Sequence, residues 1–201
     1  MKHELKWAIM GPGEISVEFL NDLRLAGMHL EAVGSRSLDR AQSYAKKHSI
    51  DRAYGSYEEL VADQDIDIVY ISTTNNAHFA NAKLALSSGK NVLLEKPFTI
   101  DAAQARELAA ISRRNGVFLM EAMWTRFLPN HKTLFEKLEQ GLIGKPLYLL
   151  ADHNQYLPKD SFPRLYDPTL GGGSLLDLGV YPISLAHRLF GNPSRILASA
   201  S

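Results

Sequence analysis

The chain has 201 residues, of which 22 are Lys or Arg and 22 are Asp or Glu, so its formal net charge at pH 7 is zero. A neutral chain has no overall field that would attract nucleic acid or an anionic membrane, and we expect neither as a partner. The sequence contains no cysteine, which excludes disulfides, thiolate zinc sites and cysteine nucleophiles. The start MKHELKWAIMG carries charge where a signal peptide needs an apolar run, so we expect a soluble, cytoplasmic protein.

Residues 1–123 alternate short apolar runs with segments of helical periodicity, which is typical of βαβ units. Ser56 with Glu59, and Asp101 with Gln104, have the spacing of capping boxes at helix starts. Gly89 and Gly116 stand where two of the helices should end. The pattern predicts an α/β fold with a doubly wound parallel sheet of the Rossmann type. The six expected strands are residues 5–10, 30–35, 52–54, 67–73, 91–95 and 117–122.

The sequence changes in character at Trp124, so we expect a second, partial domain over residues 124–201. It contains a predicted helix near residues 130–140 that ends at Gly141, a predicted strand near 145–156 and a proline-rich loop. The final SRILASAS is typical of a strand that is just starting. One helix and two strands are too little to cover a sheet, so this region has the look of an incomplete domain.

A glycine-rich turn follows the first expected strand, in the segment GPGEIS at residues 11–16. Gly11 permits a tight turn, and Gly13 lets backbone N–H groups approach a pyrophosphate at the start of the next helix. Ser16 occupies the third position of the dinucleotide fingerprint, where glycine is usual. We therefore predict a dinucleotide-binding domain over residues 1–123 that uses Gly11, Gly13, Glu14 and Ile15. A plain strand-to-helix turn is the alternative.

Ser35 and Arg36 stand at the end of the second expected strand, where an NAD-selective site usually has an acidic residue. A hydroxyl followed by a guanidinium suits a 2′-phosphate, so we predict NADP as the cofactor in preference to NAD. In the alternative, Arg36 pairs only with Asp39 or with solvent.

The fourth expected strand ends in ISTTNNAH, which brings Thr73, Thr74 and Asn75 to the carboxyl edge of the sheet, with His78 close behind. Ligands of such folds bind at this edge, so all four residues are candidate cofactor contacts. Asn75 or Asn76 could instead cap the following helix, and His78 could be a hydrogen-bonded helix residue.

The fifth expected strand delivers Glu95 and Lys96 to the same edge, and Pro97 prevents the strand from continuing. Buried charges are costly unless they are paired or used, so we expect both side chains to act near the nicotinamide end of the cofactor. A surface ion pair of little energetic value is the alternative.

Four segments, GPGEIS, STTNNAH, EKP and GGGSLLDLGVYP, occur in order and resemble the glucose-fructose oxidoreductase, inositol dehydrogenase and MocA (Gfo/Idh/MocA) family over the whole chain. The segment EAMWTRFLP and the tyrosine of DLGVYP most resemble the branch of dimeric dihydrodiol dehydrogenases and NADP-dependent xylose dehydrogenases. The inositol dehydrogenase branch carries histidine where this chain has Tyr181, which argues against an inositol substrate.

The resemblance implies an NAD(P)-dependent oxidoreductase that transfers a hydride to or from a sugar, a cyclic diol or a related polyol. It implies a second domain with an open, mostly antiparallel sheet, a homodimer or higher homo-oligomer formed through that domain, and a cis peptide bond between Lys96 and Pro97. Trp124 and Arg126 would contact the cofactor or pocket, or would only seal the domain interface. Family members continue past residue 201, so the chain resembles a truncated member, and the mass of the natural protein would test this.

Catalysis would require a group that moves one proton, because the nicotinamide carries the hydride. Asp177 and Tyr181 are four residues apart, so on a helix both project from one face. We predict Tyr181 as the proton carrier, Lys96 as the ammonium that favours its phenolate, and Asp177 as the residue that orients Lys96 or a substrate hydroxyl. In the alternative, Asp177 caps the glycine turn and Tyr181 is a core aromatic residue.

Two further expectations concern other classes of site and protein. His78, His131, His153 and His187 share no ligand spacing, so we expect no metal. The rival to an enzyme is a non-catalytic protein that keeps the dinucleotide pocket to sense cofactor or to bind a partner, and the fold cannot separate the two.

Overall fold

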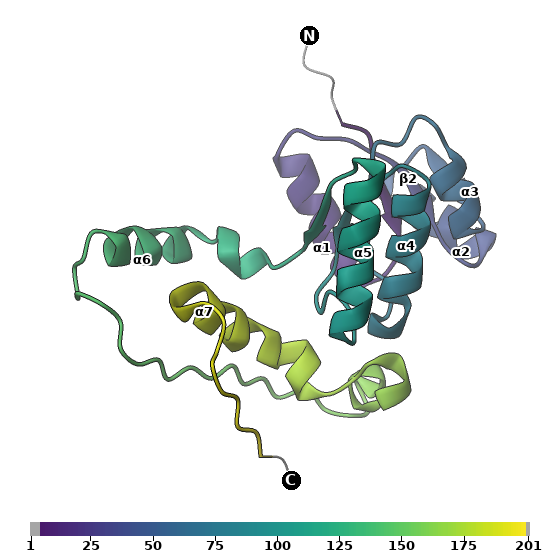
Figure 1. Ribbon diagram of the computed structural model, residues 1–201. Helices are drawn as coiled ribbons and strands as arrows, with labels where there is room; N and C mark the ends of the chain where they lie inside the picture. The colour runs from purple at the N-terminus through teal and green to yellow at the C-terminus, as the bar shows by residue number, and fades with distance from the viewer. Residues whose placement is uncertain (1–4, 200–201) are drawn as a thin grey trace. The chain divides into compact units, whose positions relative to one another are not determined.

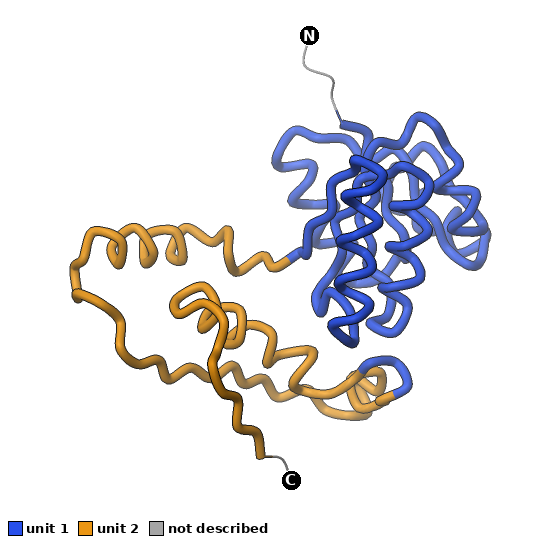
Figure 2. Tube along the Cα trace, in the orientation of Figure 1, with its two compact units in different colours: residues 1–122, 169–171 blue, residues 123–168, 172–201 orange. Residues whose placement is uncertain are grey.

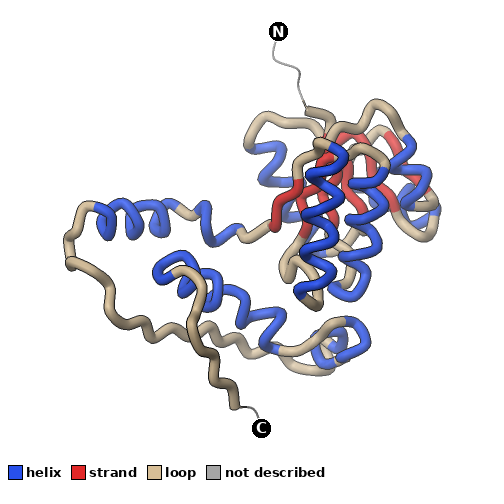
Figure 3. The backbone as a smooth tube through the Cα atoms, in the orientation of Figure 1, coloured by secondary structure: helices blue, strands red, loops and turns tan. Residues whose placement is uncertain are grey.

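The computed structural model describes residues 5–199. The chain forms two compact units, which Figure 2 distinguishes by colour. The first unit runs to Ala122 and also includes Thr169–Gly171; the second comprises Met123–Pro168 and the chain from Gly172 onward. All strands among the described residues lie in the first unit (Figure 3).

The first unit is a six-stranded parallel sheet with the order β3-β2-β1-β4-β5-β6. This order confirms the predicted Rossmann fold. All six expected strands are present, the third with the expected bounds and the other five slightly shorter than expected. The strands are β1 Trp7–Met10, β2 Leu30–Gly34, β3 Arg52–Tyr54, β4 Ile68–Ile71, β5 Asn91–Leu94 and β6 Leu119–Glu121. The helices are α1 Glu14–Leu25, α2 Leu38–His48, α3 Tyr57–Ala62, α4 His78–Ser87 and α5 Ala102–Asn115, with a 3₁₀ turn at Asn75–Ala77.

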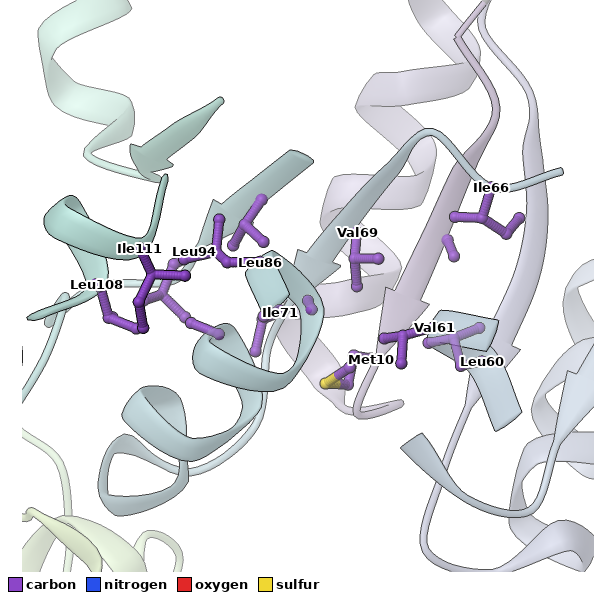
Figure 4. Close-up of a cluster of buried hydrophobic side chains, with 14 of the residues drawn as sticks. Met10, Leu60, Val61, Ile66, Val69, Ile71, Leu86, Leu94, Leu108 and Ile111 are labelled. Atoms are coloured by element: carbon purple, nitrogen blue, oxygen red, sulfur yellow. The ribbon is translucent and has the colours of Figure 1, made fainter. Parts of the chain in front are cut away.

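Helices cover both faces of this sheet because successive residues of each strand point to opposite sides. In β1, Trp7 and Ile9 join a buried cluster that includes residues of α1 and α2. Ala8 and Met10 join the other cluster, with residues of α3, α4 and α5 (Figure 4). The central strands are therefore apolar on both sides, which explains their continuous apolar runs in the sequence.

The helix starts follow the predicted capping chemistry. The Ser56 hydroxyl accepts from the Glu59 N–H at 3.1 Å, and the Asp101 carboxylate accepts from the Gln104 N–H at 2.9 Å. The Glu59 carboxylate reaches back to the N–H of Gly55, one residue earlier than a capping box requires, at 3.1 Å.

The second unit contains helices and irregular chain. Its helical elements are a 3₁₀ turn Trp124–Phe127, helix α6 Pro129–Glu139, a 3₁₀ turn Pro163–Tyr166, and a π-helical turn Leu175–Gly179 that continues into α7 Val180–Phe190 (Figure 1). A further 3₁₀ turn, Pro168–Leu170, begins in the second unit and ends in the first. The predicted helix near 130–140 is present and is followed by Gly141 with φ +75°.

Two predicted strands of the second unit are wrong. Residues 145–156 and 195–199 form no strand, and the last two residues of the second prediction lie outside the described part of the chain. A strand requires a neighbour for its backbone N–H and C=O groups, and within residues 5–199 neither segment pairs with one. Their apolar side chains are exposed, including Leu147, Tyr148, Leu150, Ile196 and Leu197.

Within residues 5–199, no helix is long and apolar enough to cross a membrane. No group of three or more His, Cys, Asp or Glu side chains in this part of the chain is arranged to hold a metal ion.

Lys90 offers a test of the polar contacts that hold the first unit together. Its side chain is buried and its Nζ donates to the carbonyl oxygens of Asp63 and Ile66, at 2.6 and 2.8 Å. Lys90→Met leaves both buried acceptors without their donor, so we expect the free energy of unfolding to fall by roughly 1–3 kcal/mol in urea titrations. Lys83→Met is the matched control, because Lys83 forms an exposed ion pair with Glu107, and its loss should cost less than about 1 kcal/mol. Equal losses in both variants would contradict the assignment.

Candidate active site

The turn after β1 approaches the loop after β4 closely at the point where the strand order reverses. Gly11 has φ +94°, and a Cβ at this position would lie 2.7 Å from Cγ2 of Thr73. Its N–H donates to the carbonyl oxygen of Gly34 at 3.0 Å. Only glycine fits this position, because a side chain would suffer both the backbone strain and the collision.

Gly13 precedes the first turn of α1 and leaves open space beside it. A Cβ on Gly13 would meet no heavy atom within 4 Å. The N–H of Gly13 donates to the Ser16 hydroxyl at 2.9 Å, and that hydroxyl donates back to the Gly13 carbonyl oxygen at 2.6 Å. Ser16 is fully buried and also hydrogen-bonds the Tyr44 hydroxyl, so it closes the helix start in place of the usual third glycine.

Glu14 and Ile15 are the first two residues of α1, where backbone N–H groups have no partner within the helix. The side chain of Ile15 is 48% exposed. N–H groups at the positive end of a helix can bind a phosphate, and the open space at Gly13 leaves room for one.

Two arginines follow β2: Arg36 lies in the loop after the strand, and Arg40 lies on the first turn of α2. Ser35 is buried and its hydroxyl accepts from the Ser37 N–H at 3.3 Å. Arg36 is exposed and forms no ion pair with Asp39. Arg40, which the sequence analysis did not consider, donates to the Pro12 carbonyl oxygen at 2.6 Å. Burial raises the pKa of the nearby Tyr57 phenol, and the charges of Arg36 and Arg40 act in the opposite direction.

The asparagines after β4 are not helix caps, so that alternative is wrong. The amide nitrogen of Asn75 donates to the Gly171 carbonyl oxygen at 2.9 Å, and that of Asn76 to the Thr169 carbonyl oxygen at 3.0 Å. The Thr74 hydroxyl donates to Oδ1 of Asn76 at 2.8 Å. These contacts bind the segment Thr169–Gly171 to the first unit.

His78 begins α4 and is 1% exposed. Its Nδ1 lies 2.8 Å from the Pro97 carbonyl oxygen and its Nε2 lies 3.1 Å from the Thr73 carbonyl oxygen. One turn later, the amide nitrogen of Asn81 donates to the Thr73 hydroxyl at 3.0 Å. The start of α4 therefore holds the loop after β4 and the loop after β5.

Glu95 is a buried carboxylate at the end of β5. Its Oε1 accepts from the Tyr70 hydroxyl at 2.6 Å, and its Oε2 accepts from the Lys96 N–H at 3.1 Å. Burial raises the pKa of Glu95, while the Tyr70 hydroxyl, the Lys96 N–H and the Lys96 charge act to lower it. Burial also raises the pKa of Tyr70, and the Glu95 charge raises it further. The phenol therefore stays protonated and donates a hydrogen bond to Glu95.

Glu95 thus fixes the backbone of Lys96, and the peptide bond between Lys96 and Pro97 is cis, as the family resemblance implied. The role of Tyr70 was not predicted from the sequence. A tyrosine in a strand buried on both faces was its only signal, because a phenol in such a place needs a partner for its hydroxyl.

Tyr181 belongs to the second unit, on the first turn of α7, and contacts two aromatic side chains there. The indole Nε1 of Trp124 donates to its hydroxyl oxygen at 3.0 Å, with the rings edge to face at 5.9 Å between centroids. The His153 ring lies 4.8 Å from the Tyr181 ring. Because indole nitrogen is only a donor, the hydrogen of the tyrosine hydroxyl points to a different acceptor.

Asp177 lies in the π-helical turn that precedes α7. It lines a cavity of about 400 Å³ within the second unit, together with residues such as Tyr166 and Gly173. Tyr181 lines a separate small hollow with Arg126, whose Nε donates to the Ser184 hydroxyl at 2.9 Å.

The glycines before Asp177 approach another part of the backbone. A Cβ on Gly172 would lie 2.7 Å from the carbonyl oxygens of Arg164 and Leu165. The N–H of Gly173 donates to the Leu165 carbonyl oxygen at 2.8 Å. The candidate residues thus divide between the two units: Glu95 and Lys96 belong to the first, whereas Trp124, Arg126, Asp177 and Tyr181 belong to the second.

Compared with known proteins, the chain matches two domain models of one family. Residues 5–123 match the model of an oxidoreductase family with an NAD-binding Rossmann fold, Gfo/Idh/MocA, and residues 131–201 match the Gfo/Idh/MocA C-terminal domain. The trans-1,2-dihydrobenzene-1,2-diol dehydrogenase of Sus scrofa is 41% identical over 199 residues, which are 96% of this chain and 59% of that protein. The same-named protein of Danio rerio is 41% identical over 200 residues, 97% of this chain and 59% of that protein. The chain therefore spans about three fifths of the length of these curated relatives.

Solved structures of the same kind cover nearly all of the chain. An NAD-binding oxidoreductase from Klebsiella pneumoniae superposes with a TM-score of 0.81 at 30% identity, covering 94% of this chain and 54% of that one. A 3-ketoreductase from Actinomadura kijaniata, in complex with NADP and TDP-benzene, gives a TM-score of 0.77 at 30% identity, covering 94% and 58%.

The buried carboxylate gives a pH-dependent prediction. Because burial raises the pKa of Glu95 in the folded state, its contribution to stability is present in acid and is lost as the pH rises above the ordinary glutamate value of about 4.3. We expect Glu95→Gln to gain stability relative to the unmodified protein as the pH rises above that value, in denaturant titrations at several pH values. Glu107→Gln, at an exposed position, is the control. If the free energies of unfolding of Glu95→Gln and of the unmodified protein differ by the same amount at every pH, the pKa of Glu95 is the same in the folded and unfolded states and the prediction is wrong.

Proposed function

Because the chain belongs to the Gfo/Idh/MocA family of oxidoreductases, we propose that the natural protein transfers a hydride between a nicotinamide dinucleotide and the carbinol or carbonyl carbon of a sugar, cyclic diol or related small polyol. The observation that carries the proposal is the position of Lys96, directly after β5 at the carboxyl edge of the sheet, with its N–H held by the buried Glu95. The names of the relatives, diol dehydrogenases and a 3-ketoreductase, support the same class of substrate.

The residues of the first unit fit a dinucleotide. Gly13 has no heavy atom within 4 Å of where its side chain would begin, which leaves room for a pyrophosphate at the start of α1. Glu14 and Ile15 would hold the phosphates by their backbone N–H groups, while Gly11 and Gly13 would let the phosphates approach the turn closely. Thr73 and Thr74 would lie beside the nicotinamide half, because they follow β4 at the same edge. The bound nicotinamide would supply the hydride acceptor or donor.

In the proposed mechanism, Tyr181 carries the proton and Lys96 supplies a positive charge that favours the phenolate form during transfer. Trp124 orients the tyrosine by donating to its oxygen, so that the hydroxyl hydrogen is directed away from the indole. Asp177 and Arg126 orient the substrate or the cofactor from the second unit. That unit would act in substrate binding and in forming a homodimer or higher homo-oligomer.

We further propose that the cofactor is NADP in preference to NAD. The end of β2 presents the exposed guanidinium of Arg36 where an acidic residue would favour NAD, and Arg40 adds a second positive charge on the first turn of α2. The two arginines have different roles in this proposal. Arg36 contacts the 2′-phosphate, whereas Arg40 supports the glycine loop through Pro12.

Arg36→Ala tests the cofactor preference. We expect this variant to lose affinity for NADPH by roughly 1–3 kcal/mol, because a charge-assisted contact to phosphate is removed, and to keep its affinity for NADH. Arg40→Ala should weaken both cofactors to a similar degree, because it removes the anchor of the loop. Fluorescence titrations with both cofactors provide the measurement, and Arg106→Ala is the exposed control. Equal losses for NADH and NADPH in Arg36→Ala would show that this residue does not read the 2′-phosphate.

Tyr181→Phe tests the proton-transfer assignment. We expect turnover to fall by about 10² to 10⁴-fold with NADPH affinity nearly unchanged, because the hydroxyl is assigned to proton transfer and not to cofactor binding. Lys96→Met should also reduce turnover, and the double variant should be little worse than the worse single one, because the two groups act as one unit. Tyr148→Phe, at an exposed tyrosine, is the control.

The assay requires a substrate, so aldoses, 1,2-diols and dicarbonyl compounds are first screened with NADP and NADPH. Full activity of Tyr181→Phe would remove this tyrosine from the mechanism. Tight cofactor binding without turnover of any compound would favour the non-catalytic, cofactor-sensing alternative.

A further inference from the structure

The buried ring of His78 lies between two backbone carbonyl oxygens that belong to different loops. Nδ1 lies 2.8 Å from the oxygen of Pro97, after β5, and Nε2 lies 3.1 Å from the oxygen of Thr73, after β4. Both distances are within the normal range of hydrogen bonds from N–H to oxygen. With the ring 1% exposed, water does not compete for either nitrogen.

This geometry constrains the protonation state of the ring. A carbonyl oxygen can only accept a hydrogen bond, and a neutral imidazole has one N–H donor and one nitrogen lone pair. A neutral His78 would therefore satisfy one carbonyl and turn its lone pair toward the other. The imidazolium form donates to both, and the two oxygens supply the acceptors that a buried cation needs.

The two loops that His78 joins are those expected to face the nicotinamide. On one side of Lys96, the carboxylate of Glu95 accepts from the Lys96 N–H. On the other side, the carbonyl of Pro97 accepts from His78. Asn81 adds a contact from the same helix to the Thr73 hydroxyl. The backbone of Lys96 is thus held on both sides, and only a doubly protonated ring donates to Pro97 and to Thr73 at the same time.

We propose that His78 is a positioning residue that acts as an imidazolium, joining the loop after β4 to the loop after β5 and thereby fixing Lys96 at the nicotinamide end of the site. The role in catalysis rests on the proposed function, whereas the protonation state does not. Titratable groups on the neighbouring elements are Glu95 and Lys96 after β5, Glu121 at the end of β6, and Asp101 at the start of α5. Glu121 accepts from the Phe98 N–H at 2.9 Å, so a carboxylate also lies at the loop that carries Pro97.

The protonation state can be measured on the unmodified protein without cofactor or substrate. Two-dimensional NMR of the ¹⁵N-labelled histidine rings distinguishes an imidazolium, with hydrogens on both nitrogens, from either neutral tautomer. We expect His78 to be an imidazolium at pH 7, with the exposed His29 as a reference in the same spectra and His78→Gln used to assign the signal. A neutral His78 ring at pH 7 would overturn the proposal, whatever the enzyme does.

The positioning role is tested by cofactor binding in His78→Gln, with His29→Gln as the matched control. A glutamine amide cannot donate to both carbonyls from two separate ring positions, so we expect the NADPH dissociation constant to rise about tenfold, the equivalent of one net hydrogen bond. In the unmodified protein the dissociation constant should rise as the pH is increased and the ring loses its proton. In His78→Gln it should be independent of pH over the same range.

These measurements distinguish a failure of the positioning role of His78 from a failure of the proposed oxidoreductase function. If His78→Gln only lowers the melting temperature and binds NADPH as tightly as the unmodified protein at every pH, the residue is structural and the positioning role is wrong. If the protein binds NADPH with the predicted pH dependence but turns over no substrate, the oxidoreductase proposal fails and the role of His78 at the cofactor site stands.

Discussion

The close approach of the turn after β1 to the loop after β4 is the constraint on which the carboxyl edge of the sheet depends. The Ser72 hydroxyl donates to the Gly11 carbonyl oxygen at 2.8 Å. The Ser72 N–H donates to the Met10 carbonyl oxygen at 3.0 Å. These contacts leave no room for a side chain at position 11. Because β1 and β4 are neighbours where the strand order reverses, this approach fixes where α1 begins and so where a phosphate would lie.

Beyond that approach, the loops at this edge are held by side chains that donate to backbone carbonyls. Arg40 donates to Pro12, Asn75 to Gly171, and His78 lies between Thr73 and Pro97. Loops lack the repeating ladders of helices and sheets, so each buried carbonyl needs an individual donor. A substitution at one of these donors therefore changes the geometry of the site without touching the residues that would do chemistry.

The sequence predicted the first unit well because its elements carry local signals. Apolar runs identified the strands, and Ser56, Asp101 and Gly116 marked helix ends through contacts within a few residues. The strand predicted at 145–156 failed because pairing depends on a neighbour that local sequence does not specify. For the site, the glycine loop and the Glu95–Lys96 pair were proposed from their positions after β1 and β5 alone. The roles of Tyr70, Arg40 and Asn75 escaped prediction because each depends on a partner at least 25 residues away, at Glu95, Pro12 and Gly171.

The inclusion of Thr169–Gly171 in the first unit has a consequence for the order in which the protein is made. A ribosome synthesises the sheet and its helices well before residue 171, so a nascent chain that stops at Ala122 already contains every strand of the unit. Until the later segment emerges, the amides of Asn75 and Asn76 lack the carbonyl oxygens of Gly171 and Thr169. The unit therefore acquires its last contacts only after residues 123–168 have been translated, and a fragment cut at Ala122 would lack them permanently.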